Sequence, residues 1–514
     1  MPHKNKFIPH QLSIKNEEVE MSSGVLRLIR DDDDARVWYK NIQRFPCASV
    51  RIMLRTPMGW PTLAQKVKAR LYSALVEDTL RENLWNAQIA GLTASISVGS
   101  LGLELSLWGY TEKMHVLLEE IVSMMRKLVI VPERFVILKE CLTQTYRDSD
   151  YQLPLAQATD MMRCLCEEKE WMNDEYAAEL EHIEAHDIMA FFPQLFKDNH
   201  IEVLALGDLT KEEASAMTNI ITSSLHSRSL PVFQWGVRRA IMLPPGSNYI
   251  YERRLTDLSQ VNSCIAYYLY IGDMVDDMSR ANLLLLMEIF QQPALAQLCS
   301  KEKLAYAIES RAHCSATTIG YLFVIQSEHL ASYLEARIDS FLDSFTKTLV
   351  DMSEEEFESQ KERIVSKLEK KPGNLGDETA RLWDHIKSEG FGLWNETAAG
   401  IIRDLSKQDF IDFYSEYIDP MSETRAKLSI HLNARSAGTD KMPVAKAEGT
   451  DAPHILPTGS NSTGTINKKN PIHISDVHRF KAGMPLGPGP IDRDRIDPAR
   501  FSKSAGVMRE GTGK

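Results

Sequence analysis

The feature that most constrains the fold is a repeat with a period of roughly 220 residues. One copy begins with the alternating apolar segment Cys47-Ala-Ser-Val-Arg-Ile-Met-Leu, and the other with Cys264-Ile-Ala-Tyr-Tyr-Leu-Tyr-Ile. Alternation of this kind predicts a strand with one buried face. Each copy continues with the pattern of a helix, a hairpin of two short strands and two more helices. The chain therefore predicts one supersecondary unit used twice.

The predicted elements are placed by hydrophobic spacing and by helix-start signals. Pro132 suits a first helical position, and Ser353-Glu-Glu-Glu356 reads as a capping box. Apolar residues from Leu330 to Phe345 recur at three- and four-residue spacing, which predicts an amphipathic helix. In the first copy we expect helices over about 61–85, over 111–128 and from 132, with strands at 92–98 and 101–108. In the second copy we expect helices over about 277–298, from 330 and from 353, with strands at 306–311 and 320–326.

These elements predict an α+β fold class. Each copy forms a mostly antiparallel sheet with helices on one face, a two-layer domain, and closes with a helix and a strand at 200–206 or 427–432. We expect two homologous domains, 1–230 and 231–436. The segment 437–514 holds eight of the 22 prolines and little periodicity, so it is expected to be a disordered low-complexity tail, with a binding tail as the alternative.

Composition excludes several classes of function. The net charge is −12 and no dense Lys/Arg block occurs, which argues against nucleic-acid binding. The first twenty residues lack a signal-peptide core, and the most apolar run, which starts at Ala281, is interrupted by a carboxylate, so no membrane span is expected. Seven cysteines without a CxxC pair indicate reduced thiols in a cytoplasmic protein.

No self-sufficient catalytic motif is present. His182 and His186 have the four-residue spacing of zinc ligands, but Glu184 lies two residues from each, which turns it to the far side of a helix. Neither HExxH nor HxxEH occurs, and the phosphate-binding and nucleophile-elbow motifs are absent. We therefore expect no metal site, no catalytic residue and no cofactor in this chain.

Several ordered segments together resemble one known family, the insulysin-type zinc metallopeptidases, which include insulin-degrading enzyme and its fungal pheromone-processing relatives. The resemblance is to the carboxy-terminal half of these proteins and covers roughly 5–435. It rests on Phe7-Ile8-Pro9, Val37-Trp-Tyr-Lys40, Leu75-Val-Glu-Asp-Thr-Leu-Arg-Glu82, Ala90-Gly-Leu92, Trp108-Gly-Tyr110, Ala190-Phe-Phe-Pro-Gln-Leu195, Lys301-Glu-Lys-Leu-Ala-Tyr306 and Phe323-Val-Ile-Gln-Ser-Glu328.

The resemblance implies four similar domains that enclose a chamber, with the zinc, its HxxEH ligands and the general base in the half that this chain lacks. It also implies that an arginine and a tyrosine seven residues apart bind substrate from this half. Tyr306 matches the tyrosine, whereas Cys299 replaces the arginine and Ala305 replaces a glycine. A thiol offers one weak donor where a guanidinium offers a charged fork. The alternative for Tyr306 is a core aromatic at the start of a strand.

The expected function is the non-catalytic, substrate-holding half of a peptidase chamber. An extended peptide would bind along a sheet edge, with zinc only if a separate catalytic half supplies it. The expected partners are a peptide and either a catalytic metallopeptidase half or a second copy of the chain. Two alternatives remain: a subunit of a split zinc metalloendopeptidase, and a scaffold or remnant that binds no peptide.

Overall fold

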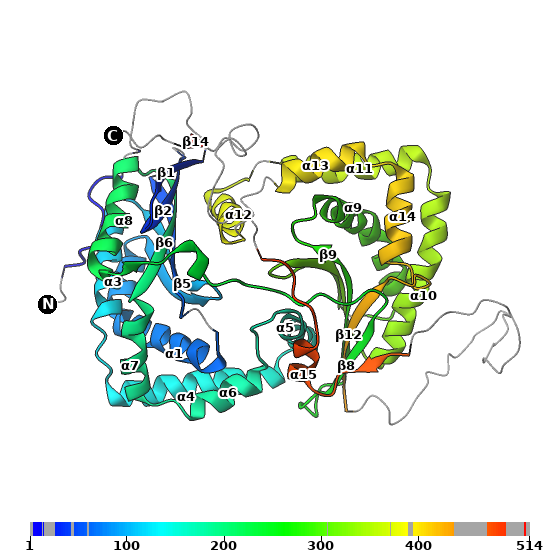
Figure 1. Ribbon diagram of the computed structural model, residues 1–514, viewed down its shortest axis with the longest axis horizontal. Coiled ribbons are helices and arrows are strands. Elements are labelled where there is room, and N and C mark those ends of the chain that lie inside the picture. Colours follow the sequence, from blue (N-terminus) through cyan, green and yellow to red (C-terminus); the bar gives the residue numbers. More distant parts are fainter. Residues whose placement is uncertain are drawn as a thin grey trace, which may run out of the picture.

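The computed structural model describes residues 4–12, 14, 26–42, 46–58, 61–305, 307–370, 372–388, 394–435, 470–489 and 508–509 of the 514. Two sheets dominate it, one on the left and one on the right of Figure 1, each with its own helices on the outer side. The predicted α+β fold class with two similar layered units is confirmed. The boundary that we place between residues 230 and 231 stays a prediction.

The first sheet is built around β3, which pairs antiparallel with both β5 and β6. Its β2 runs parallel to β6, while the hairpin of β4 and β5 forms one end. The strand order is β14 (Met508–Arg509), β1 (Arg27–Asp31), β2 (Ala35–Asn41), β6 (Asp198–Gly207), β3 (Cys47–Arg55), β5 (Gly102–Tyr110) and β4 (Leu92–Gly99), with β7 (Arg228–Ser229) beside β6.

The second sheet has the same connectivity. Its central strand β9 pairs antiparallel with β11 and β12, and β8 runs parallel to β12. The strand order is β10 (Ala307–Cys314), β11 (Thr318–Ser327), β9 (Ser263–Asp273), β12 (Ala426–Asn433), β8 (Asn248–Arg254) and β13 (Ile472–His473). Strand by strand, β4-β5-β3-β6-β2 matches β10-β11-β9-β12-β8, so the sequence repeat is also a repeat of topology.

One face of each sheet is covered by helices from its own half. In the first half, these helices bury one side of β3 through Val50, Ile52 and Leu54. They are α1 (Leu63–Thr79), α2 (Arg81–Ile89), α3 (Met114–Arg126), α4 (Pro132–Asp148), α6 (Asn173–Glu181), α7 (Ala185–Leu195) and α8 (Lys211–Leu225). In the second half they are α9 (Asp277–Ala294), α10 (Ala331–Asp351), α11 (Glu354–Glu369), α13 (Trp394–Asp404) and α14 (Lys407–Tyr417).

The predicted helix-start signals are confirmed, with two local differences. The single helix expected over about 61–85 is two helices, α1 and α2, which meet at Leu80. The Ser353 hydroxyl accepts the Glu356 N–H, and Glu356 accepts the Ser353 N–H, as a capping box requires. Pro132 opens α4. On α10 the predicted stripe is buried from Leu334 onward, but Leu330, which caps the helix, is exposed and so is Tyr333. The first turn of that helix therefore projects beyond the core.

The other face of each sheet carries a helix from the opposite half, which the sequence pattern did not predict. Helix α5 (Pro154–Cys166) packs on β9, β11 and β12 of the second sheet. Helix α12 (Leu375–Lys387) packs on β3 and β6 of the first sheet, where Trp383 is buried. Both helices lie between the two sheets in Figure 1. This reciprocal crossing joins the two halves into one unit.

Residues 470–489 differ from the prediction of a tail without regular structure. They form β13, which extends the second sheet beside β8, and α15 (Val477–Ala482). Phe480 is buried edge-on against Tyr249, with ring centroids 5.1 Å apart. The apolar residues of this stretch are few, but they complete a core that the rest of the chain already supplies. Apart from Met508–Arg509, the rest of the tail lies outside the described residues.

One helix in the described part of the chain, Asp277–Lys301, is long and apolar enough to cross a membrane by length and composition. Its apolar residues Leu285, Leu286 and Phe290 are buried in the second core. This is the behaviour of a core helix in a globular domain.

Candidate functional site

The segment that follows α9 leaves the helix without glycine or asparagine. After Pro293 the helix widens into a π-helical turn, Leu295–Lys301, and Lys303 then adopts a left-handed conformation with φ of 52°. Non-glycine residues rarely adopt this conformation, and π-turns frequently mark functional positions. The charged segment between α9 and β10 therefore has two unusual backbone features, the π-helical turn and the left-handed Lys303.

Glu302 holds this turn in place. Its carboxylate accepts two hydrogen bonds from Arg337 on α10, at 2.7 and 2.9 Å, and one from Gln297 at 2.7 Å. The Arg337 hydrogen bond lowers the pKa of Glu302. A bidentate pair of this kind fixes orientation as well as position. The turn that carries Cys299 is thus anchored to the helical layer.

Cys299, which replaces the family arginine, is half-buried within the π-helical turn. Burial raises the pKa of its thiol, so the group stays a neutral, weak donor at neutral pH. Tyr306 lies outside the described residues. The role of Cys299 and Tyr306 as substrate-binding positions therefore stays a prediction.

Strand β10 begins directly after Tyr306 and forms one end of the second sheet. All eight of its residues pair antiparallel with β11 without a register shift. Ile308 and Ala312 pack on the core beneath the helices, so Glu309, Arg311 and His313 lie on the opposite face. Charged side chains therefore lie on one face of this end strand, and no catalytic motif in the sequence points to them.

His313 is the third member of that row and is half-buried. Its ring packs edge-on against Tyr268, with centroids 5.2 Å apart, and its Nε2 lies 3.2 Å from the Ser315 hydroxyl. Burial, with a smaller effect of Arg311, lowers the pKa of His313 to about 4. The ring is therefore neutral at pH 7, and the charge of this face comes from Glu309 and Arg311.

The histidines considered as zinc ligands lie at the ends of two helices. His182 ends α6, Glu184 caps the start of α7, and His186 is in its first turn. His186 Nδ1 lies 3.6 Å from Glu184 Oε2, and both side chains are exposed. Among the described residues no group of three or more His, Cys, Asp or Glu side chains is arranged to hold a metal ion. These residues do not fit the zinc site that the resemblance implies for the complete enzyme.

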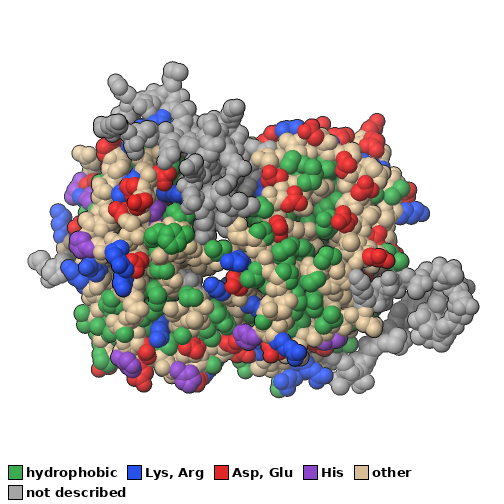
Figure 2. All heavy atoms as spheres, in the orientation of Figure 1, with side chains coloured by type: hydrophobic (Ala, Val, Ile, Leu, Met, Phe, Trp, Pro, Cys, Tyr) green, Lys and Arg blue, Asp and Glu red, His purple; other side chains and the backbone are tan. Residues whose placement is uncertain are grey.

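A charged cavity of about 280 Å³ lies where the two halves meet, lined from α1, the β4–β5 hairpin, α12 and the segment before β8. Figure 2 shows basic side chains beside the hollow between the halves. The cavity is lined by seven basic residues, Lys66, Arg70, Arg163, Lys169, Arg238, Arg239 and Lys387, and by four acidic ones, Glu104, Glu167, Glu168 and Glu170.

Lys66 and Glu170 form a buried ion pair in this cavity. Burial lowers the pKa of Lys66 to about 8, although Glu170 opposes the shift. Tyr176 donates its hydroxyl to Glu170 at 2.8 Å. Because Arg238 also pairs with Glu167 and Lys387 with Glu104, most of the charges here are engaged within the protein. The Arg238–Glu167 and Lys387–Glu104 pairs join the two halves, so the cavity wall is a structural junction.

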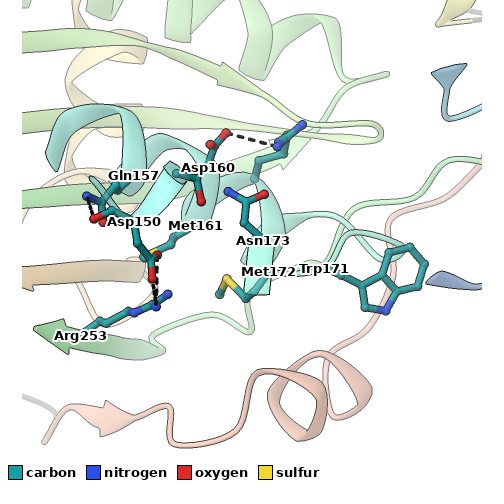
Figure 3. A pocket seen from close by; sticks show the side chains of 10 residues that line it. Asp150, Gln157, Asp160, Met161, Trp171, Met172, Asn173 and Arg253 are labelled. Atoms are coloured by element: carbon teal, nitrogen blue, oxygen red, sulfur yellow. Dashed lines mark hydrogen bonds and ion pairs between the residues drawn. The ribbon is translucent and has the colours of Figure 1, made fainter. Parts of the chain in front are cut away.

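A second hollow, between α5 and β8, has room for about 20 Å³, on the scale of one water molecule. Figure 3 shows Asp150 and Arg253 joined across it, with two oxygen–nitrogen distances of 3.1 and 3.3 Å. Gln157 donates to the Asp150 carbonyl at 3.0 Å. The Asp150–Arg253 pair therefore also joins the two halves, and the hollow beside it is too small for a ligand.

Comparisons with known proteins connect both halves to one group. A family model described as the middle or third domain of peptidase M16 matches residues 1–179, and one described as PQQ synthase PqqF-like, C-terminal lobe domain 4, matches 285–383. The chain is 32% identical over 436 residues to a putative zinc protease, mug138, of Schizosaccharomyces pombe, covering 84% of the chain and 45% of that protein.

Human insulin-degrading enzyme is 29% identical over 496 residues, which cover 95% of the chain and 47% of the enzyme. The crystal structure of pitrilysin superposes with a TM-score of 0.79 and 19% identity, over 95% of the chain and 49% of that structure. The chain thus spans about half the length of the curated relatives it matches.

Proposed function

Because the chain is homologous to the M16 peptidases of the insulin-degrading enzyme and pitrilysin type, we propose that it is the substrate-holding half of a peptidase chamber. In this role it binds an extended peptide and presents it to catalytic groups that these 514 residues do not contain.

We assign the zinc chemistry to another polypeptide segment because no group of ligands for a metal ion is found within the residues that the structure describes. The sequence has no HxxEH, and the nearest approach, His182 with His186, has its carboxylate at the wrong spacing and on the exposed ends of helices. Zinc peptidases need three protein ligands and a base beside the metal. The partner that this role requires is therefore a polypeptide segment with an HxxEH motif.

The observation that carries the proposal is the position of β10. In the described part of the chain it is one of the two end strands of the second sheet, it is regular over its full length, and it follows the anchored turn that bears Cys299. Every second residue of such a strand directs its N–H and C=O away from its neighbour. An extended peptide satisfies these groups by adding one more strand, largely independent of its sequence.

Cys299 and Tyr306 would contact the peptide at the start of this edge. A guanidinium in place of the thiol would donate charged hydrogen bonds to peptide carbonyls. With cysteine there, binding relies on the backbone ladder and on Tyr306. A scaffold that binds no peptide is the alternative, and it would be indifferent to both side chains.

We also propose that the protein acts in the cytoplasm. The seven cysteines are all free, and Cys164, Cys166 and Cys264 are buried in apolar surroundings that raise the pKa of each thiol. Thiols of this kind suit a reducing compartment.

The test uses the purified chain in three assays. Elemental analysis is expected to give far less than one zinc per chain, peptide hydrolysis is expected to be absent with or without a chelator, and fluorescence anisotropy is expected to show saturable binding of a labelled extended peptide. One zinc per chain together with chelator-sensitive hydrolysis would refute the assignment of catalysis elsewhere. Absence of binding for a broad peptide set would refute the holding role.

A further inference from the structure

The sheet edges of the described chain differ in what covers them. In the second sheet β13 lies beside β8, and in the first sheet β14 lies beside β1. At the β4 end, the Ile96 N–H is bonded to the Glu77 carboxylate at 2.9 Å and the Ile96 carbonyl accepts the Ser73 hydroxyl at 3.0 Å. Side chains of α1 therefore occupy the middle of that edge.

Strand β10 has no such cover in the described residues, since β11 is the only strand paired with it. Uncovered edges in native proteins are normally protected by charged side chains, and β10 carries two. Glu309 and Arg311 are 43% and 38% exposed and form an ion pair with each other, with Arg311 Nε 3.5 Å from Glu309 Oε2. A half-exposed pair of this kind contributes little stability and opens at small cost.

The two charges have a fixed order along the edge. Because alternate residues share a face, Glu309 and Arg311 lie on the same side of the sheet, away from α9 and α10. The side chains of an added strand on that side would lie directly opposite them, at the distance where opposite charges attract and like charges repel. The positions of Glu309 and Arg311 therefore favour one order of charged residues along an added strand over the reverse order.

We infer that Glu309 and Arg311 select the peptide that binds β10: an extended segment that adds antiparallel and carries an acidic residue opposite Arg311 and a basic residue opposite Glu309. Antiparallel pairing continues the pattern of β10 with β11 and is the more stable ladder. Read from its N-terminus, such a peptide has the order acidic–any–basic. This inference rests on the proposed holding role and names the substrate class for it.

The inference distinguishes peptides of identical composition. We compare two labelled peptides that differ only in the exchange of a Glu and a Lys two positions apart, so net charge, length and apolar content are equal. For the native chain the Glu–x–Lys order is expected to bind roughly fivefold more tightly than Lys–x–Glu, since each cross-strand pair contributes about 0.2–1 kcal/mol. Added salt is expected to reduce this ratio because the pairs are exposed.

The charge-exchanged double variant Glu309→Arg with Arg311→Glu is expected to reverse the preference. A matched control exchanges the exposed pair on the outer helices, Glu369→Arg with Arg403→Glu, which should leave the native ratio unchanged. Circular dichroism and thermal melts of all variants verify that each is folded.

The outcomes separate the inference from the proposed function. If native chain and exchanged variant bind both peptides with the same ratio, the selection by Glu309 and Arg311 is refuted while the holding role stands. A native preference for the Lys–x–Glu order would refute antiparallel addition. If no chain binds either peptide or any other extended peptide, the holding role fails and the inference fails with it.

Discussion

Trp383 of the second half donates its indole N–H to Glu104 of the first sheet at 3.3 Å, although 279 residues separate them. Lys387, one turn further along α12, lies 3.8 Å from the same carboxylate. The counterpart of α12 in the first half is α5, which packs on the second sheet. Each half therefore supplies a helix that the sheet of the other half requires.

Replacement of Trp383 tests this crossing. Trp383→Ala is expected to lower the free energy of unfolding by about 3–5 kcal/mol, because a large buried ring is lost from the contact between halves. Urea unfolding measures the change. The control is Trp85→Ala, which removes an exposed indole from α2 and should change stability by less than about 0.5 kcal/mol. Equal effects of both variants would contradict the importance of the crossing.

Glu335 gives the fold a dependence on acidic pH. This buried carboxylate on α10 pairs with Lys427, and His431 Nε2 lies 2.7 Å from its Oε2. Burial alone would raise its pKa, but the contacts with His431 and Lys427 outweigh burial and lower the pKa to about 2 from an ordinary 4.5. The folded state thus holds the proton less tightly than the unfolded state.

The sign of the effect follows from that difference. The contribution of Glu335, about 3 kcal/mol, is complete above pH 4.5 and is lost as the pH falls toward 2. The unfolding free energy of the native chain minus that of Glu335→Gln is expected to shrink over this range. Glu362→Gln, at an exposed position of α11, serves as control and should give a flat difference. A Glu335→Gln difference independent of pH would show that the carboxylate charge is not involved.

Cys299→Arg tests the loss of the family arginine. The variant is expected to tighten the binding of an extended peptide by about tenfold or more, since a charge-assisted hydrogen bond contributes on the order of 1.5–3 kcal/mol. Anisotropy titration measures the affinity. Cys141→Arg, which adds the same charge at an exposed position of α4, is the control. An equal gain in both variants would mean that only net charge had changed.

Phe480→Ala tests whether residues 470–489 depend on the core they complete. Loss of the ring that packs on Tyr249 is expected to remove about 3 kcal/mol and to expose this segment to limited proteolysis and to rapid amide hydrogen exchange. Phe233→Ala removes an 84% exposed ring and should leave both measurements unchanged. Unaltered protection of 470–489 in Phe480→Ala would contradict the packing described.

The connection around Lys303 shows where local rules stop. The segment between α9 and β10 contains no glycine, yet Lys303 adopts a left-handed conformation there. Arg337, 34 residues later in the chain, holds the adjacent Glu302 and thereby offsets the cost. The residue that stabilises this turn is therefore distant in the sequence, and the residues of the turn itself do not predict its conformation.

The amino-acid sequence by itself determined the two similar sheets, the outer helices and their caps, because alternation, helical spacing and capping act between residues close in the chain. It also contained the resemblance that the comparisons confirm. Tertiary structure alone decided that α5 and α12 exchange sheets, that 470–489 completes the second core, and that, among the described residues, β10 has no strand paired with its outer side. These outcomes depend on apolar surfaces that meet only after the sheets have formed. The hydrophobic effect is not directional, so an apolar helix face in the sequence does not specify which sheet will bury it.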